Sequence, residues 1–134
     1  MPNIEDVEGI GPSFGEKLRK AGVTSTDELL KNGATPAGRK SLAETSGISD
    51  ALLLKWVNYV DLYRIKGVGS EYADLLEAAG ADTVPELAQR VPANLHAKLG
   101  QTNEEKKLVR RLPTALEVEG WITEAKTLPR VVQY

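Results

Sequence analysis

The chain has 134 residues and a formal net charge of −2, from 17 basic and 19 acidic side chains. A protein devoted to duplex DNA usually carries an excess of basic residues, so any nucleic-acid site here must be a local one. The chain has no cysteine and one histidine. It therefore has no disulfide framework, no thiolate nucleophile and no zinc site of the common kinds.

The length fits one domain or two small repeats, and a hydrophobic fraction of 41% is enough for a core. No apolar stretch approaches the length of a membrane span. The acidic start MPNIEDVEG lacks the apolar segment of a signal peptide. We therefore expect no membrane partner and a cytoplasmic location.

Residues 3–7 predict one helical turn, and the segment VEGIGPSFGEKLRKAG at residues 7–22 follows it. We call this segment the first hairpin. Gly9 and Gly11 allow the backbone to reverse within a few residues. Pro12 suits the first turn of a helix, and Gly22 suits the left-handed position just past a helix end. The first hairpin therefore predicts a tight turn that opens into a helix.

Three further helices follow in the first half of the chain. Ser25 with Glu28 fits a capping box for a short helix, and Thr35 starts the next one, which Gly47 ends. The third is a long helix over residues 50–65. It contains no glycine or proline, and apolar residues recur along it at helical spacing, so we expect it to be central. These residues are Leu53, Trp56, Val57, Val60 and Tyr63.

The first hairpin has a second copy, IKGVGSEYADLLEAAG at residues 65–80, which we call the second hairpin. The two align without a gap at an offset of 58 residues, the distance from Gly9 to Gly67. Phe14 aligns with Tyr72. Gly15 aligns with Ala73, and two small residues at one position predict that another helix packs closely there.

The rest of the chain is also predicted to be helical. Thr83 with Glu86 starts a short helix ending near residue 91, and residues 92–99 form another that Gly100 stops. Thr102 with Glu105 caps a helix that carries Lys106, Lys107, Arg110 and Arg111. Thr114 with Glu117 starts the last helix, which Pro129 ends. Trp121 lies 65 residues after Trp56, so the second copy carries a seven-residue insertion, and residues 131–134 form an irregular tail.

This pattern predicts an all-α fold of two repeats, residues 1–64 and 65–134, joined by the shared long helix 50–65. No linker rich in glycine, serine or proline separates the repeats. We expect one compact, cooperative unit.

Residues 9–15 and 67–73, with the apolar residues before them, follow the pattern apolar-x-Gly-apolar-Gly, three variable residues and a small residue. They resemble the helix-hairpin-helix motif. With its tryptophan helices and the segment KKLVRRLP, the whole chain resembles an uncharacterised bacterial family of tandem helix-hairpin-helix proteins, a domain of unknown function. The resemblance implies tandem helical bundles similar to SAM domains, and it brings no activity with it.

Helix-hairpin-helix proteins commonly hold a DNA phosphate with backbone N–H groups at the turn, aided by the positive end of the helix dipole. The resemblance thus implies binding to duplex DNA without sequence specificity. Pro12 and Ser13 stand where DNA-binding members often have a basic residue. The first hairpin offers the main candidates, which are Gly9, Gly11, Ser13, Lys17, Arg19 and Lys20.

The second hairpin is a weaker candidate, because Glu71 stands in the first helical turn and would repel a phosphate. Its candidate residues are Gly67, Gly69, Arg64 and Lys66, and an accessory basic patch contains Lys106, Lys107, Arg110 and Arg111. Each feature also has a plain structural interpretation: turns that only connect helices, and basic residues on a solvated face. Trp56 and Trp121 are expected in the core, and His96 as a packed or surface residue.

The two hairpins carry opposite charges around their turns. Asp6 and Glu8 before the first turn align with Arg64 and Lys66, whereas Arg19 aligns with Glu77. We hypothesise that the hairpin surfaces are electrostatic complements, either within one molecule or head-to-tail between molecules.

No group of residues has the spacing of a catalytic or metal-binding site, and residues 9–15 do not match the dinucleotide-binding fingerprint. We therefore predict a protein that is not an enzyme and has no cofactor or metal. Two functions stay open: a nucleic-acid-binding module, and a protein-interaction or scaffold module that binds no nucleic acid.

Overall fold

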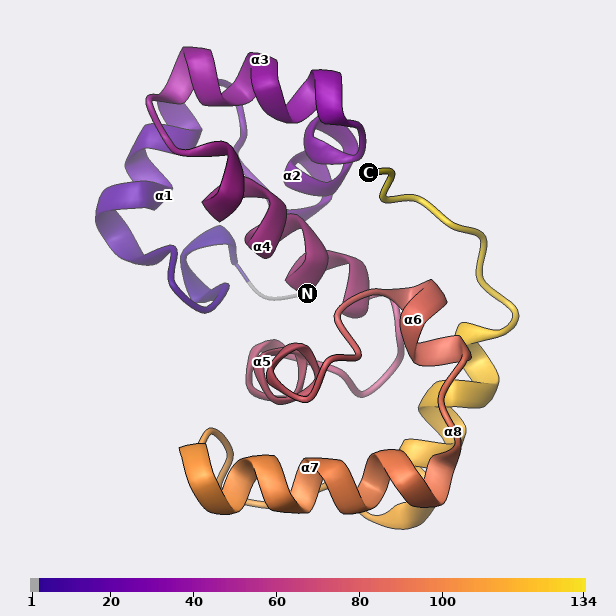
Figure 1. Cartoon of the computed structure of the whole chain (residues 1–134). Coiled ribbons are helices and arrows are strands. Elements are labelled where there is room, and N and C mark those ends of the chain that lie inside the picture. Colours follow the sequence, from indigo (N-terminus) through magenta and orange to yellow (C-terminus); the bar gives the residue numbers. More distant parts are fainter. Residues whose placement is uncertain (1–2) are drawn as a thin grey trace. The chain divides into compact units, whose positions relative to one another are not determined.

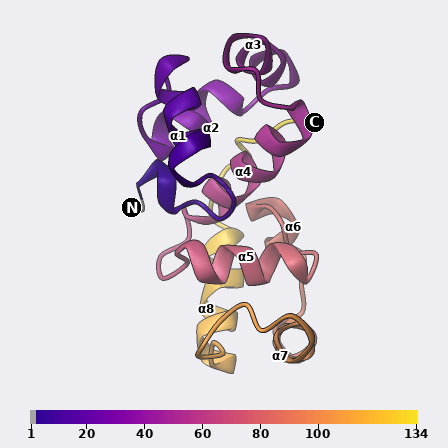
Figure 2. The same ribbon diagram turned by 90° about the vertical axis from the view of Figure 1, so that its left-hand side faces the viewer.

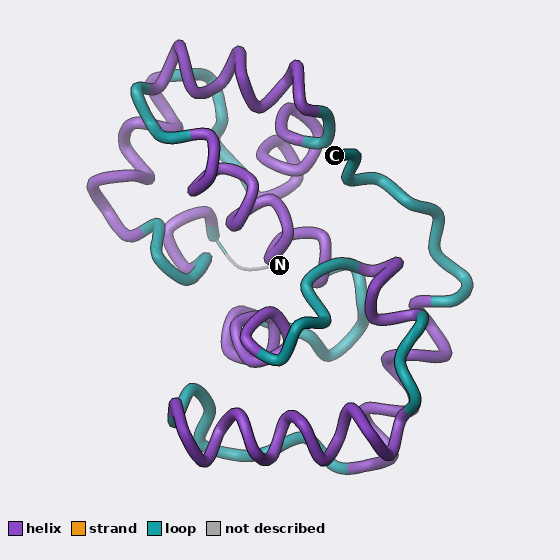
Figure 3. Tube along the Cα trace, in the orientation of Figure 1, coloured by secondary structure: helices purple, strands orange, loops and turns teal. Residues whose placement is uncertain are grey.

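The computed structural model describes residues 3–134, which form one 3-10 turn and eight α-helices without a strand (Figure 3). The predicted all-α class is confirmed. In chain order the elements are η1 (Ile4–Asp6), α1 (Gly11–Lys20), α2 (Thr26–Gly33), α3 (Pro36–Ser46), α4 (Asp50–Leu62), α5 (Ser70–Ala78), α6 (Val84–Ala88), α7 (Pro92–Lys106) and α8 (Ala115–Ala125) (Figure 1). Among these described residues, no helix has the length and apolar character that crossing a membrane requires.

The chain divides into two compact units. Unit 1 contains the residues up to Asp61 together with Val131–Tyr134, and unit 2 contains Leu62–Arg130. The repeat boundary at residues 64 and 65 and the single cooperative unit stay predictions.

The predicted caps start four of the helices. In each case a hydroxyl accepts a hydrogen bond from the backbone N–H three residues later, which satisfies one of the free donors at a helix start. The pairs are Ser25 with Glu28, Thr35 with Gly38, Thr83 with Glu86 and Thr114 with Glu117. The box is reciprocal at Thr114, whereas the Glu28 carboxylate accepts from the N–H of Thr24 instead of Ser25.

Helix α4 supplies the core of unit 1, as its apolar spacing predicts. Leu53, Trp56 and Val60 are each at most 1% exposed. The helix ends at Leu62, three residues earlier than predicted, where the N–H of Ile65 donates to the carbonyl of Leu62 in a turn.

The predicted break between a short helix over residues 92–99 and a second helix capped by Thr102 is wrong, because one helix, α7, runs through Gly100 to Lys106. A glycine inside a helix costs only about 1 kcal/mol relative to alanine. Leu95, Leu99 and Thr102 are all buried at helical spacing, and their packing outweighs that cost. In Figure 1 α7 lies lengthwise and α5 end-on, and Figure 2 shows the reverse, so these helices of unit 2 cross steeply.

The chain leaves α7 at Lys107, which has φ of +52°. The Asn103 side chain then replaces the helical bonds, because it accepts from the N–H of Val109 at 2.9 Å and donates to the carbonyl of Val109 at 3.2 Å. Arg110 and Arg111 therefore lie in the loop between α7 and α8, not on a helix.

The C-terminal tail is irregular, as predicted, and it packs in unit 1. The N–H of Gln133 donates to the carbonyl of Ala34 at 2.7 Å, and Val132 is 2% exposed. Arg39, which is itself buried, donates to the carbonyls of Gly33 and Gln133, both at 2.8 Å. One buried guanidinium thus joins the end of α2 to the tail.

Candidate functional site

The first glycine of each hairpin adopts the same conformation. Gly9 has φ of +92° and Gly67 has φ of +90°, values that residues with side chains rarely adopt. The same bond closes both turns. The N–H of Ile10 donates to Val7 at 3.0 Å, and the N–H of Val68 donates to Ile65 at 3.1 Å. Each turn also packs on the core through the apolar residue between its glycines, since Ile10 and Val68 are both buried.

A tryptophan lies behind each turn. A Cβ atom added to Gly9 would stand 3.2 Å from Trp56 Nε1, and one added to Gly67 would stand 3.4 Å from Trp121 Nε1. An aromatic pair supports both rings, at centroid distances of 5.1 Å and 5.2 Å and interplanar angles of 59° and 52°. The pairs are Phe14 with Trp56 and Tyr72 with Trp121. Both tryptophans are buried, which confirms their predicted place in the core.

The turns differ at their second glycine. Gly11 is left-handed with φ of +60°, whereas Gly69 has φ of −103° and is extended. The next residue is Pro12 in the first hairpin and Ser70 in the second. Because proline has no N–H, the first hairpin offers one amide fewer to an anion at this position.

The three predicted cations of the first hairpin lie exposed on α1, and each has a local partner. Lys17 Nζ lies 5.5 Å from the centroid of the Phe14 ring. Lys20 forms an ion pair with Glu16 at 3.3 Å, and its side chain stays 77% exposed. Exposed pairs of this kind contribute about 0–1 kcal/mol. Lys17 and Lys20 can therefore exchange these partners for a phosphate at little cost.

Arg19 is held more firmly than the two lysines. Its guanidinium lies 2.6 Å from the Glu5 carboxylate, which joins α1 to η1. Gly15 makes this approach possible, because a Cβ atom there would stand 2.7 Å from Glu5 Cγ. Gly15 was predicted to let another helix pack closely, and here it instead makes room for the Glu5 side chain of η1.

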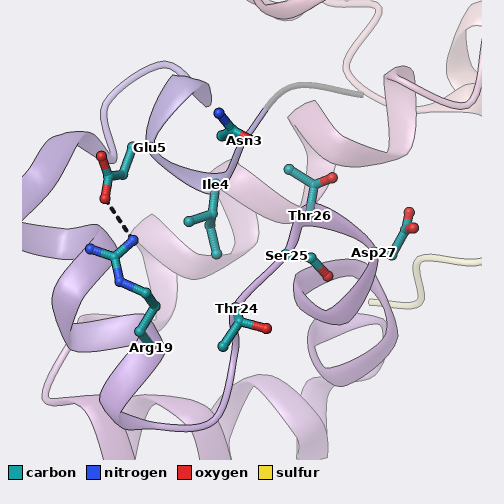
Figure 4. Close-up of a pocket in the computed structure, with 8 residues that line it drawn as sticks. All are labelled: Asn3, Ile4, Glu5, Arg19, Thr24, Ser25, Thr26 and Asp27. Atoms are coloured by element: carbon teal, nitrogen blue, oxygen red, sulfur yellow. Dashed lines mark ion pairs between the residues drawn. The ribbon is translucent and has the colours of Figure 1, made fainter.

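The same ion pair borders a surface cavity of about 410 Å³ in unit 1 (Figure 4). Its lining residues are Asn3, Ile4, Glu5, Arg19, Thr24, Ser25, Thr26 and Asp27. Several of their polar groups already bond within the protein. Ser25 caps α2, and the Thr24 hydroxyl donates to Glu28, which lowers the pKa of that carboxyl. Across residues 3–134 no group of three histidine, aspartate or glutamate residues could hold a metal ion.

The second hairpin carries carboxylates where an anion would bind. The backbone N–H of Lys66, just before the turn, donates to the Glu124 carboxylate at 3.0 Å. Glu71 is exposed in the first turn of α5. Arg64, on the entry side, donates to the carbonyl of Pro129 at 2.6 Å. These carboxylates would repel an anion that approached the second turn.

The accessory basic patch is split between the end of α7 and the following loop. Lys106, Lys107 and Arg110 are exposed. Arg111 instead binds Glu117 through two bonds of 3.0 Å, and that guanidinium, followed by the Thr114 N–H, lowers the pKa of Glu117 to about 2. The charge of Arg111 is therefore largely neutralised.

The loop also packs onto the second hairpin, since the Tyr72 hydroxyl donates to the carbonyl of Arg111 at 3.0 Å. This contact is not predictable from the sequence, because the Thr102–Glu105 pattern predicts a helix there. His96 has a structural role, with Nε2 lying 3.1 Å from the carbonyl of Pro113.

A family model described as "Domain of unknown function (DUF4332)" matches residues 8–128, nearly the whole chain. No curated protein and no solved structure matches the sequence.

Proposed function

The chain belongs to the family DUF4332, a domain of unknown function, and from that starting point we propose that it is a non-catalytic module that binds the nucleic-acid backbone. The two repeats are helix-hairpin-helix units in this proposal, and the first hairpin makes the main contact.

One observation carries the proposal. Gly9 and Gly11 are both left-handed in a turn that opens α1, and α1 carries the exposed cations Lys17 and Lys20. Backbone amides at a helix start and the positive end of the helix dipole attract an anion. The two lysines add mobile positive charge further along α1, in its last turn. Ser13, in the first turn of α1, supplies an N–H and a hydroxyl.

The remaining candidates have smaller roles. Lys106, Lys107 and Arg110 form an accessory patch in unit 2, and the second hairpin contributes little because Glu71 and Glu124 are close to its turn. Binding would be weak and steeply salt-dependent, since few phosphates are neutralised and the chain as a whole is acidic.

Fluorescence anisotropy with a labelled DNA duplex, repeated over a salt series, tests the proposal. We expect Lys17→Glu to weaken binding about tenfold at low salt and to lower the slope of log K against log salt by about 1. Lys40→Glu is the matched control, because Lys40 is an exposed lysine of the same unit that lies on α3 and outside the first hairpin's sequence. Equal losses in both variants would show a general charge effect and no site.

A protein-interaction module is the second candidate, and the carboxylates around the second hairpin favour it. A Glu124 oxygen already accepts the Lys66 N–H, and Glu71 is exposed beside the turn. Anisotropy that stays flat at tens of micromolar protein and low salt would exclude the nucleic-acid function and leave this one.

A further inference from the structure

We infer that the two hairpins are complementary docking surfaces, through which the first hairpin of one molecule binds the second hairpin of another copy. The inference uses the charges around the turns and does not depend on nucleic-acid binding.

Its first support is that the hairpins share one geometry. The glycine conformations at Gly9 and Gly67, the closing bonds and the tryptophan contacts all repeat at equivalent positions. The two backbones therefore agree up to the first glycine and differ at Gly11 and Gly69, and the charges on either side of the turns can be compared by their alignment.

Its second support is that the charges at several equivalent positions have opposite signs, with Glu16 and Asp74, which are both acidic, as an exception. Before the turn, the exposed Glu8 is equivalent to the exposed Lys66. After the turn, Arg19 on α1 is equivalent to Glu77 on α5, and Ser13 is equivalent to the exposed Glu71. The first hairpin is acidic before its turn and basic after it, and the second hairpin has the reverse order.

This arrangement identifies the partner as a second copy. When two like-shaped surfaces meet about an approximate two-fold axis, positions near the axis face their own equivalents. Here Glu8 would attract Lys66 and Arg19 would attract Glu77, whereas two first hairpins or two second hairpins would place like charges together at these positions. Such complementarity selects the partner and its orientation more than it adds affinity.

Existing contacts leave Glu8 and Lys66 exposed, whereas Arg19 would have to exchange its ion pair with Glu5 for the new contact. The Lys20–Glu16 pair is exposed and therefore weak. In unit 2, Arg111 lies beside the second hairpin through its bond with Tyr72, but its guanidinium is held by Glu117 and does not neutralise Glu71.

Sedimentation equilibrium of the full chain at low and high salt, without nucleic acid, tests the inference. We expect the average mass at low salt to rise above that of one chain with increasing concentration, and to return to one chain at about 0.5 M salt, where the Debye length is below 10 Å. Glu8→Lys and Lys66→Glu should each abolish the rise.

The double variant E8K/K66E should restore association, because each contact again pairs opposite charges while the net charge is unchanged. The matched control is E44K/K40E, which exchanges two exposed charges on α3. A single-chain mass for the native protein at every salt concentration would overturn the inference. A double variant that stays monomeric, or a control that also loses association, would overturn it as well.

Discussion

The two hairpins have the same backbone conformation at their first glycine and nearly opposite charges around their turns. Gly9 and Gly67 differ by 2° in φ, from +92° to +90°, and each lies against a tryptophan. Yet the first is followed by three cations on α1, whereas carboxylates surround the second. A glycine, a buried apolar residue and an aromatic pair thus suffice to build the turn. The capacity to bind an anion depends on the side chains added to it.

The two units also differ in length, and the difference is not one inserted block. Helix α6 has five residues where α2 has eight, and α7 has 15 where α3 has 11. Residues 107–114 replace the short connection 47–49 before the tryptophan helix. Residues 89–91 likewise replace the shorter connection 34–35, so the predicted seven-residue insertion is the net result of one shortening and three extensions.

The largest expected effect tests whether the two tryptophans are equivalent. Replacing either Trp56 or Trp121 by alanine should lower the free energy of unfolding by about 3–5 kcal/mol, the usual cost for a buried tryptophan. Urea denaturation followed by circular dichroism measures it, with Trp→Phe at each position as the milder control. A loss below 1 kcal/mol at one position would show that the aromatic pair supports only one unit.

The buried Arg39 is a feature of unit 1 that unit 2 lacks. Arg39 is the fourth residue of α3, and the fourth residue of the corresponding helix of unit 2, α7, is Leu95. Arg39→Ala removes two hydrogen bonds that a charged group donates, and it should lower the free energy of unfolding by about 2–3 kcal/mol. Lys40→Ala, an exposed neighbour, should change stability by less than about 0.5 kcal/mol.

The C-terminal tail offers an independent check on Arg39. In a chain ending at residue 130, Arg39→Ala should cost less than in the full chain, because the Gln133 carbonyl is already gone. Identical costs in the two backgrounds would mean that the tail and Arg39 are not coupled.

Gly11 and Gly69 isolate the effect of backbone conformation. A Cβ atom added to either meets nothing within 4 Å, but only Gly11 has a positive φ. We expect Gly11→Ala to lower the unfolding free energy by about 1–2 kcal/mol, and Gly69→Ala to leave it unchanged or raise it slightly. Thermal denaturation of the two variants measures the difference, and equal losses would contradict the assigned conformations.

The smallest effect concerns pH and is confined to unit 2, because the residue equivalent to Glu117 in unit 1 is Leu52. Arg111 lowers the pKa of Glu117 from 4.5 to about 2 in the folded state. The stabilisation is therefore complete above pH 4.5 and is lost as the pH falls towards 2. An NMR titration of the Glu117 carboxyl checks the value, and Arg111→Ala should return it towards 4.5.

The amino-acid sequence by itself determined the features that depend on a few neighbouring residues. The caps at Ser25, Thr35, Thr83 and Thr114 form as predicted. Gly22 adopts the predicted left-handed conformation, as do its equivalent Gly80 and the helix-ending Gly47. The tryptophans equivalent by alignment both lie behind their turns. Such features are readable in one sequence because each requires only a local bond or a permitted dihedral angle.

Only the tertiary structure decided the continuity of α7, the loop that carries Arg110 and the partners of the basic residues. Burial of Leu95 and Leu99 overrides the helix-breaking tendency of Gly100, and Asn103 forms the loop by bonding to Val109. Arg39 bonds to the carbonyl of Gln133, a residue 94 positions away. These contacts join residues that become neighbours only when the chain folds, so local spacing cannot reveal them.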